Sequence, residues 1–229
     1  MSLLDVPVSV THDLVAALTG ALEPLTGGGP AGAAAIVLFT AAVRLLLVPL
    51  AVAQARGERA RTRLLPKIQD LRKRHARDPE RLRSEMAALY AAEGASPFSG
   101  CLPALAQWPF FAVMYRLFTS AVIAGHQNLL LTNTLMGVPL GQNLLSVGLF
   151  SSGSLVFLVL LVLLAVVAWW SSRRVAADGP LGAFARLPPF GTVAVAAFVP
   201  LAAGLHLLTS AAWTAAERAV LHRRVALAP

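Results

Sequence analysis

The feature that most constrains the fold is an apolar run with a single charge inside it. Residues Ala33 to Gln54 are long enough to cross a bilayer as one helix, and Arg44 lies near their middle. The next basic residue, Arg56, follows about 18 Å further along a helix axis. A charge at such a depth costs roughly 2.5–3.5 kcal/mol. The run therefore predicts a polar cavity around Arg44, or a structural partner for it on another helix, and we favour the cavity.

Composition and charge placement predict an integral membrane protein. The 229 residues are 57% hydrophobic and 13% charged, whereas soluble domains average about 45–50% and 25%. Basic residues gather between Arg56 and Arg83, between Arg173 and Arg186, and between Arg218 and Arg224. By the positive-inside rule these three regions are cytoplasmic. The N-terminus is then outside and the C-terminus is in the cytoplasm.

The order of apolar and charged segments predicts an all-α membrane protein with a single domain. We expect five transmembrane helices, an N-terminal amphipathic helix in the outer interface and a cytoplasmic helical hairpin. The predicted ranges are 7–25 for the interfacial helix, 33–54, 102–124, 155–170, 187–199 and 201–221 for spans 1 to 5, and 55–93 for the hairpin. Pro49 predicts a bend within the first span.

Two signals define the hairpin. Asp78 suits a helix N-cap and Pro79 suits the first helical residue, so they separate two helices with narrow apolar stripes. The basic surface of the hairpin allows a nucleic-acid role. A solvated hairpin on the cytoplasmic side explains the same charges, and we favour it.

Two further polar residues lie in apolar runs. Arg116, near the outer end of the second span, predicts a side chain that snorkels to the surface, and a place at the outer mouth of the cavity stays open. His206 predicts a packed, hydrogen-bonded core histidine rather than a metal ligand.

The remaining chemistry is sparse. The chain has one cysteine, five histidines without metal-ligand spacing, and no phosphate-binding glycine loop followed by Lys-Ser/Thr. No nucleophile stands in a recognisable constellation with a base. We therefore expect no metal, no cofactor and no enzymatic activity.

A long motif in the middle of the chain resembles a known family. The run Leu64–Phe111 (LLPKIQDLRKRHARDPERLRSEMAALYAAEGASPFSGCLPALAQWPFF) combines a basic helix, an Asp-Pro break, an E-M-x-x-L-Y helix and then G-C-L-P and Q-x-P-F. It is similar to the cytoplasmic hairpin and following span of the YidC membrane protein insertases, in their short form, within the mitochondrial, chloroplast and bacterial insertase superfamily. Ile36–Leu50 resembles the first core span of that family, with Arg44 at the place of its groove arginine.

The sequence also departs from the family pattern. Many members carry a glutamine where Trp169–Ser172 stand, and a Tyr-Trp pair where Leu208–Thr209 stand. Many also have a basic tail that helps to hold the ribosome, whereas this sequence ends five residues after Arg224.

The resemblance implies an insertase and chaperone of the bacterial plasma membrane. It would move nascent apolar segments from the cytoplasm into the bilayer through a hydrophilic groove, without nucleotide hydrolysis. The candidate groove residues are Arg44, Gln107, Ser171, Ser172, Thr209 and Trp213. Expected partners are nascent membrane proteins and the lipid bilayer, with the ribosome and the Sec translocation channel as further ones, and a monomer suffices. A small-solute or anion transporter, or an assembly factor without translocation activity, remain the alternatives.

Overall fold

Helices account for most of the fold, as the sequence predicts. The computed structural model describes residues 5–94, 108–123, 125–148, 150–174 and 186–226. The helices are α1 (Asp5–Thr26), α2 (Ala31–Leu46), α3 (Val48–Arg74), α4 (Pro79–Ala92), α6 (Trp108–Thr119), α7 (Leu144–Val147), α8 (Ser154–Ser172), α10 (Pro188–Ala196) and α11 (Leu201–Ala226). The chain divides into two compact units, one of residues Leu46–Pro109 and the other of Met1–Leu45 with Phe110–Pro229. Each unit is described by itself.

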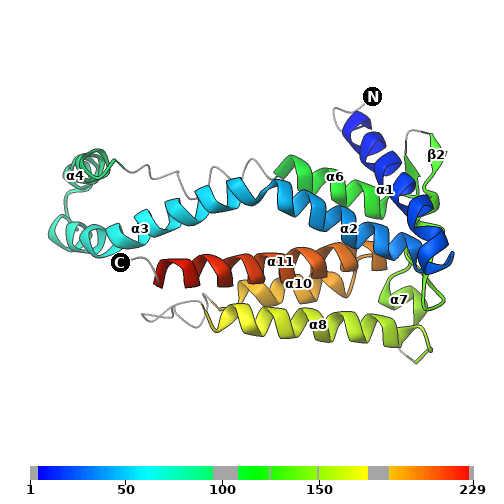
Figure 1. Cartoon of the computed structure of the whole chain (residues 1–229). Coiled ribbons are helices and arrows are strands. Elements are labelled where there is room, and N and C mark those ends of the chain that lie inside the picture. The colour runs from blue at the N-terminus through cyan, green and yellow to red at the C-terminus, as the bar shows by residue number, and fades with distance from the viewer. Residues whose placement is uncertain (1–4, 95–107, 124, 149, 175–185, 227–229) are drawn as a thin grey trace. The chain divides into compact units, whose positions relative to one another are not determined.

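The larger unit is built around three neighbouring helices, α8, α10 and α11 (Figure 1). Phe157 and Leu164 of α8 and Leu201 of α11 are almost completely buried. Gly204 makes the approach of α8 and α11 close, because a Cβ there would lie 3.0 Å from Cδ2 of Leu160. A small residue at a helix contact lets the two backbones approach closely, as is common between helices in membranes.

One described helix is long and apolar enough to cross a membrane alone. It is α8, which has a mean hydropathy of 2.6 and is only 28% buried. Several of its large side chains, including Leu155, Val159 and Val166, are more than half exposed, as suits lipid contact. Helices α2 and α3 are together long and apolar enough for a second crossing, either as a broken span or as a re-entrant loop. Helices α6 and α10 are shorter, with 12 and 9 residues.

The first predicted span is interrupted where the sequence places its proline. Helix α2 ends at Leu46, Leu47 adopts φ −85° and ψ −2°, and Pro49 stands in the first turn of α3. Proline has no N–H to continue the helical ladder, and its ring disfavours helical geometry just before it. The predicted bend at Pro49 is therefore confirmed as a break two residues earlier. Helix α3 then continues without interruption to Arg74, well into the predicted hairpin.

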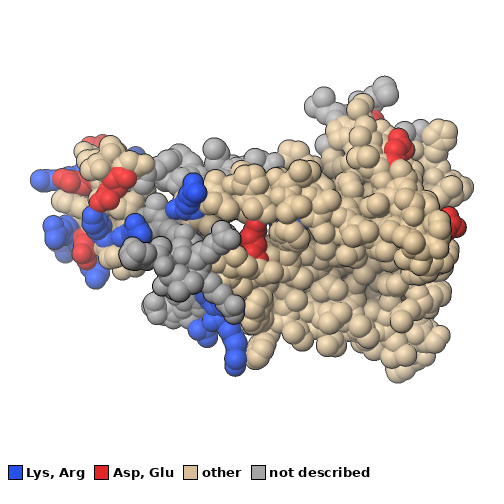
Figure 2. All heavy atoms as spheres, in the orientation of Figure 1, with Lys and Arg blue, Asp and Glu red and all other residues tan. Residues whose placement is uncertain are grey.

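The smaller unit contains the α3–α4 hairpin. Asp78 is the N-cap of α4, since its carboxylate accepts a hydrogen bond from the Arg81 backbone N–H at 3.0 Å, and Pro79 begins the helix. The cap and the break between the helices are thus confirmed. Lys67 of α3 forms an ion pair with Glu93, just after α4. On the face drawn in Figure 2, Lys, Arg, Asp and Glu side chains gather on this hairpin, whereas most of the remaining surface is uncharged.

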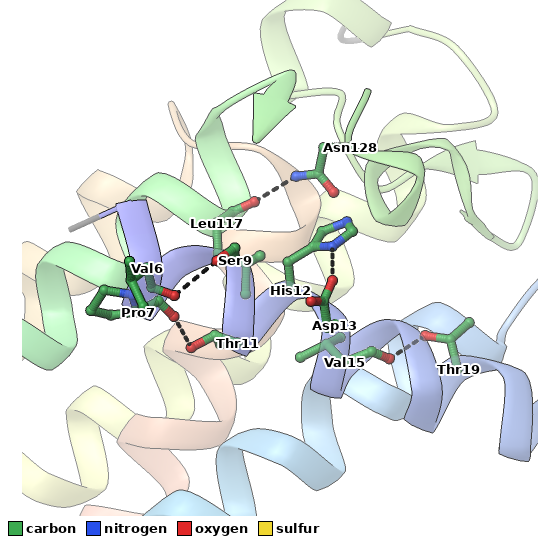
Figure 3. Close-up of polar contacts among 10 residues, drawn as sticks. All are labelled: Val6, Pro7, Ser9, Thr11, His12, Asp13, Val15, Thr19, Leu117 and Asn128. Atoms are coloured by element: carbon green, nitrogen blue, oxygen red, sulfur yellow. Dashed lines mark hydrogen bonds and ion pairs between the residues drawn. The ribbon is translucent and has the colours of Figure 1, made fainter. Parts of the chain in front are cut away.

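The second predicted span, 102–124, corresponds to a shorter described helix. Helix α6 ends at Thr119, and Val122–Ile123 form strand β1, which pairs antiparallel with β2 (His126–Gln127). The helix stops because the buried Asn128 folds back on it. Its Nδ2 donates to the Leu117 carbonyl at 2.8 Å (Figure 3). It also donates to the Ser120 carbonyl at 3.1 Å, so that acceptors at the helix end are satisfied.

The uncharged stretch after α6 has its own local structure. It contains the 3-10 turn η1 (Leu129–Thr132) and a second small hairpin, β3 (Thr134–Leu135) with β4 (Val138–Pro139). Helix α7 follows and begins with a capping box formed by Asn143 and Ser146. These short strands are a local departure from the all-α prediction. They occur where the segments between turns are too short to form a stable helix.

Helix α1 packs through a different face from the one its apolar stripe suggests. The apolar residues at roughly helical spacing in this helix are Val10, Leu14, Leu18, Leu22 and Leu25. They do not share one environment, because Val10, Leu14 and Leu25 are more than half exposed. The packed face is formed by the buried Val8 and Val15, with Leu18 and Leu22 against the core. The hydroxyls of Ser9, Thr11 and Thr19 bond to carbonyls of their own helix (Figure 3). One apolar face therefore stays outward, as an interfacial helix requires.

Candidate functional site

A buried hydrogen bond ties the first span to the last helix. Thr40 Oγ1 of α2 and His206 Nδ1 of α11 lie 3.0 Å apart, and the two residues are only 1% and 8% exposed. The imidazole ring lies near the rings of Phe118 and Phe110, with centroids 5.6 and 6.4 Å away. His206 is thus a packed, hydrogen-bonded core histidine, as its sequence context predicts. The bond fixes which faces of α2 and α11 meet.

Arg44 follows Thr40 by one helical turn and therefore lies on the same side of α2. Its side chain is half-buried, neither enclosed nor fully exposed. Its charge acts on two groups of α11, Glu217 and His206. Among the residues that the structure describes, Arg44 and Glu217 do not approach within the 4.0 Å of an ion pair. Arg44 thus faces polar groups of another helix without being locked to one of them.

Helix α11 presents a polar stripe toward this arginine. His206, Ser210, Trp213 and Glu217 recur at steps of four, three and four residues, which places them on one helix face. Ser210 Oγ and Glu217 Oε1 are buried and have no hydrogen-bond partner within the described parts of the chain. Buried polar atoms without partners are costly and uncommon in folded proteins. We call these four residues the α11 stripe.

The other predicted site residues lie elsewhere. Thr209 donates its hydroxyl to the Leu205 carbonyl at 2.8 Å, and Ser172 donates to the Trp169 carbonyl at 2.8 Å, so both bond within their own helices. Ser171 is half-buried beside Ser172 at the end of α8. Gln107 lies outside the described residues. Among the four other candidates that the structure describes, Trp213 shares a helix face with groups that Arg44 acts on, and Ser171, Ser172 and Thr209 do not.

Sequence reasoning missed Thr40, Ser210 and Glu217. The available signal was the spacing of polar residues in the last apolar run, because positions 206, 210, 213 and 217 repeat with helical period. Thr40 is one turn before Arg44, so helical spacing also places these two residues on one face. Thr209, the predicted residue of this helix, falls on a neighbouring face.

Two other basic regions are satisfied by close partners. Arg116 Nη1 donates to Asp5 Oδ1 at 3.0 Å, which links the end of α6 to the start of α1. At the end of α8, the guanidinium carbons of Arg173 and Arg174 lie 4.1 and 4.0 Å from the ring centroids of Trp169 and Trp170. These cation–π contacts place aromatic and basic groups together, as is typical of a membrane interface.

Metal chemistry has no visible support in the described segments, in which no group of three or more His, Cys, Asp or Glu side chains could hold an ion. The arrangement instead offers one cation, one carboxylate and several neutral polar groups within an apolar helical unit. Together with the charged hairpin and the apolar helix α8, these features are typical of a helical membrane protein.

Comparisons with known proteins give the family. Residues 25–227 match the family described as "60Kd inner membrane protein". The chain belongs to this family, that of the YidC membrane protein insertases. It is 42% identical over 92 residues to the membrane protein insertase YidC of Granulibacter bethesdensis. These 92 residues are 40% of this chain and 16% of that protein. It is 36% identical over 108 residues to the YidC of Clostridium perfringens, covering 47% and 43% of the two chains. The matches thus span less than half of these relatives.

Proposed function

We propose that this protein inserts nascent apolar segments from the cytoplasm into the bilayer, through a hydrophilic groove that contains Arg44. The observation that carries the proposal is the half-buried Arg44 beside the α11 stripe, within an otherwise apolar unit. Family membership supports membrane protein insertion as the general activity. The groove and its role are our inference from the charge, the burial and the unpaired polar atoms.

The energetics need no nucleotide. A segment of about 20 apolar residues gains roughly 6–12 kcal/mol on entering lipid. Moving a short polar tail across the hydrocarbon opposes this gain by a few kcal/mol for each charge. A polar site part-way across lowers the barrier because the tail stays solvated for longer. We therefore propose that the protein acts without hydrolysis and is not an enzyme.

Each part of the molecule has a role in this proposal. The charged α3–α4 hairpin is the first contact for the incoming chain on the cytoplasmic side. Arg44 attracts an acidic tail in surroundings of reduced dielectric, where Coulomb attraction exceeds that in water. The outward apolar side chains of α8 offer a surface along which the inserted segment passes into lipid.

The setting follows from the same reasoning. We place the protein in the bacterial plasma membrane, with its N-terminus outside, its C-terminus in the cytoplasm and α1 in the outer interface. Its partners are nascent membrane proteins and lipid. The ribosome and the Sec translocation channel are further proposed partners, and a monomer contains all the groups that the mechanism uses.

Complementation tests the general activity. Cells depleted of their own insertase are supplied with the full chain, and insertion of a small single-span protein is scored by protease protection. Rescue supports the proposal. A transporter would give no insertion and would move solute into vesicles, and an assembly factor would stabilise subunits that another machinery has inserted. Either result would overturn the insertase function.

A second experiment tests the groove. Purified full-length protein in lipid vesicles is given a single-span substrate with Asp residues in its outer tail, or a twin with Asn at the same positions. Arg44→Ala should slow the acidic substrate more than its neutral twin, by about tenfold in the ratio of rates for a loss of roughly 1–2 kcal/mol of attraction. Equal slowing of both substrates would contradict an electrostatic role.

A further inference from the structure

The most informative group outside the predicted site is the carboxylate of Glu217. It is a rare acidic side chain on an apolar helix, half-buried, and its Oε1 is buried without a hydrogen-bond partner in the described regions. An ordinary surface glutamate has both oxygens in water. A carboxylate that is partly withdrawn from solvent needs compensation by a nearby positive charge. The structure supplies two such charges, Arg44 on α2 and the neighbouring Arg218 on α11 itself.

The geometry of the two helices places Glu217 along the path from the cytoplasm to Arg44. Helices α2 and α11 start near the same end of their unit and run in the same direction (Figure 1), and they are fixed to each other by Thr40 and His206. Arg44 lies about 6 Å further along α2 than Thr40, and Glu217 lies about 16 Å further along α11 than His206. Ser210 is therefore level with Arg44, and Glu217 is about two turns nearer the cytoplasmic end.

The two side chains keep this offset, because both helices run in the same direction and side chains tilt toward the N-terminus of their own helix. The charge of Arg44 acts on Glu217 across it. On the same stripe, Ser210 lies at the level of Arg44 and Trp213 lies between the two levels, and Ser210 Oγ is also buried without a partner within the described residues. The stripe thus provides a short polar path with a carboxylate at its cytoplasmic end and a cation at its inner end.

We propose that Glu217 is a built-in counter-charge of Arg44 that an incoming acidic tail must displace, and that it thereby sets which substrates the groove accepts. The inference rests on the proposed insertase function and goes one step further, to specificity. Because Glu217 repels anions and weakens the field of Arg44, acidic tails enter only when their own charge competes with it. Neutral tails are insensitive to both groups.

The test compares Glu217→Gln with the unmodified protein, using the acidic substrate and its neutral Asn twin in vesicles. Glutamine keeps the shape and removes the charge, so the ratio of acidic to neutral insertion rates should rise about three- to tenfold. Asp13→Asn is the matched control, because it removes one negative charge from an exposed position on α1. It should leave the ratio unchanged. In an Arg44→Ala background, Glu217→Gln should raise the ratio of acidic to neutral insertion rates clearly less than it does in the parent protein.

A second measurement does not depend on insertion. Trp213 lies one turn before Glu217 on the stripe, and in a variant with Trp108, Trp169 and Trp170 replaced by Phe it is the only tryptophan. Its quenching by iodide, relative to the neutral quencher acrylamide, reports how readily an anion reaches the stripe. Glu217→Gln should raise this relative quenching at least twofold, and high salt should reduce the difference.

The outcomes separate the two proposals. If the parent protein inserts neither substrate, the proposed function fails, whereas the quenching result still decides whether Glu217 excludes anions. If Arg44→Ala lowers the acidic-to-neutral ratio but Glu217→Gln changes neither that ratio nor the quenching, the counter-charge is overturned and the insertase proposal stands. An equal rise with Asp13→Asn would also overturn it, because the effect would then reflect net charge alone.

Discussion

Thr40 Oγ1 and His206 Nδ1 form a hydrogen bond of 3.0 Å between residues that are 166 positions apart in the chain. Both residues are buried, so neither can exchange this partner for water. The bond fixes the rotation of α2 relative to α11, and Arg44 follows one turn later. Placement of the arginine thus depends on a neutral pair that makes no contact with a substrate in our proposal.

Thr40→Val should destabilise the protein through this pair. Valine has the same shape but leaves the His206 nitrogen unpaired, at a cost of about 1 kcal/mol, within the range measured for hydrogen bonds between membrane helices. Thermal unfolding in detergent measures the loss. Thr19→Val is the control, since the Thr19 hydroxyl bonds only to the Val15 carbonyl of its own helix. An equal loss in both variants would show that the bond to His206 has no special weight.

Arg44→Lys should retain most of the preference for acidic tails. The proposed attraction requires a positive charge and not the planar fork of a guanidinium, and among the described residues no two-pronged ion pair of Arg44 would be lost. The acidic-to-neutral ratio of insertion rates measures the effect, with Arg44→Ala as the lower limit. A lysine variant as weak as the alanine variant would point to a specific guanidinium geometry instead.

Replacing Gly204 with alanine should destabilise the protein, and replacing it with valine should destabilise it more. An added Cβ meets Leu160 Cδ2 at 3.0 Å, so Leu160 must shift for alanine, and a branched side chain forces α8 and α11 apart. We expect about 1–3 kcal/mol of destabilisation for Gly204→Val, read from detergent unfolding. Gly191→Ala, in open space on α10, is the control and should be neutral or slightly stabilising. Equal stability of the two glycine variants would refute close packing at Gly204.

Asp78→Ala should loosen the hairpin without altering the larger unit. The substitution removes the carboxylate that caps α4 through the Arg81 N–H, which is worth about 1 kcal/mol. Hydrogen exchange should then speed up in the first turn of α4 and stay constant in α8. Ser84→Ala, at an exposed position within α4, serves as the control. Unchanged exchange in α4 after loss of Asp78 would mean that the tertiary contacts of the hairpin hold it without the cap.

Local features of the fold could be predicted because they depend on neighbours in the chain. The break near Pro49 follows from a missing N–H, and the start of α4 at Pro79 follows from the carboxylate before it. The apolar run of α8 needs no partner to be recognised as helical. By contrast, the packed face of α1 was not predictable, because exposed Leu14 and buried Val15 are equally apolar and differ only in what lies beside them.

The sequence by itself determined that an arginine lies within an apolar helix and that polar residues recur along the last one. Only the tertiary structure decided that the helix face with His206 and Glu217 is turned toward α2, where the charge of Arg44 acts on both groups. The helical period places residues on a common face, but it does not fix how that face is turned toward another helix. That rotation is set by long-range packing and by the hydrogen bond between Thr40 and His206, which no local pattern contains.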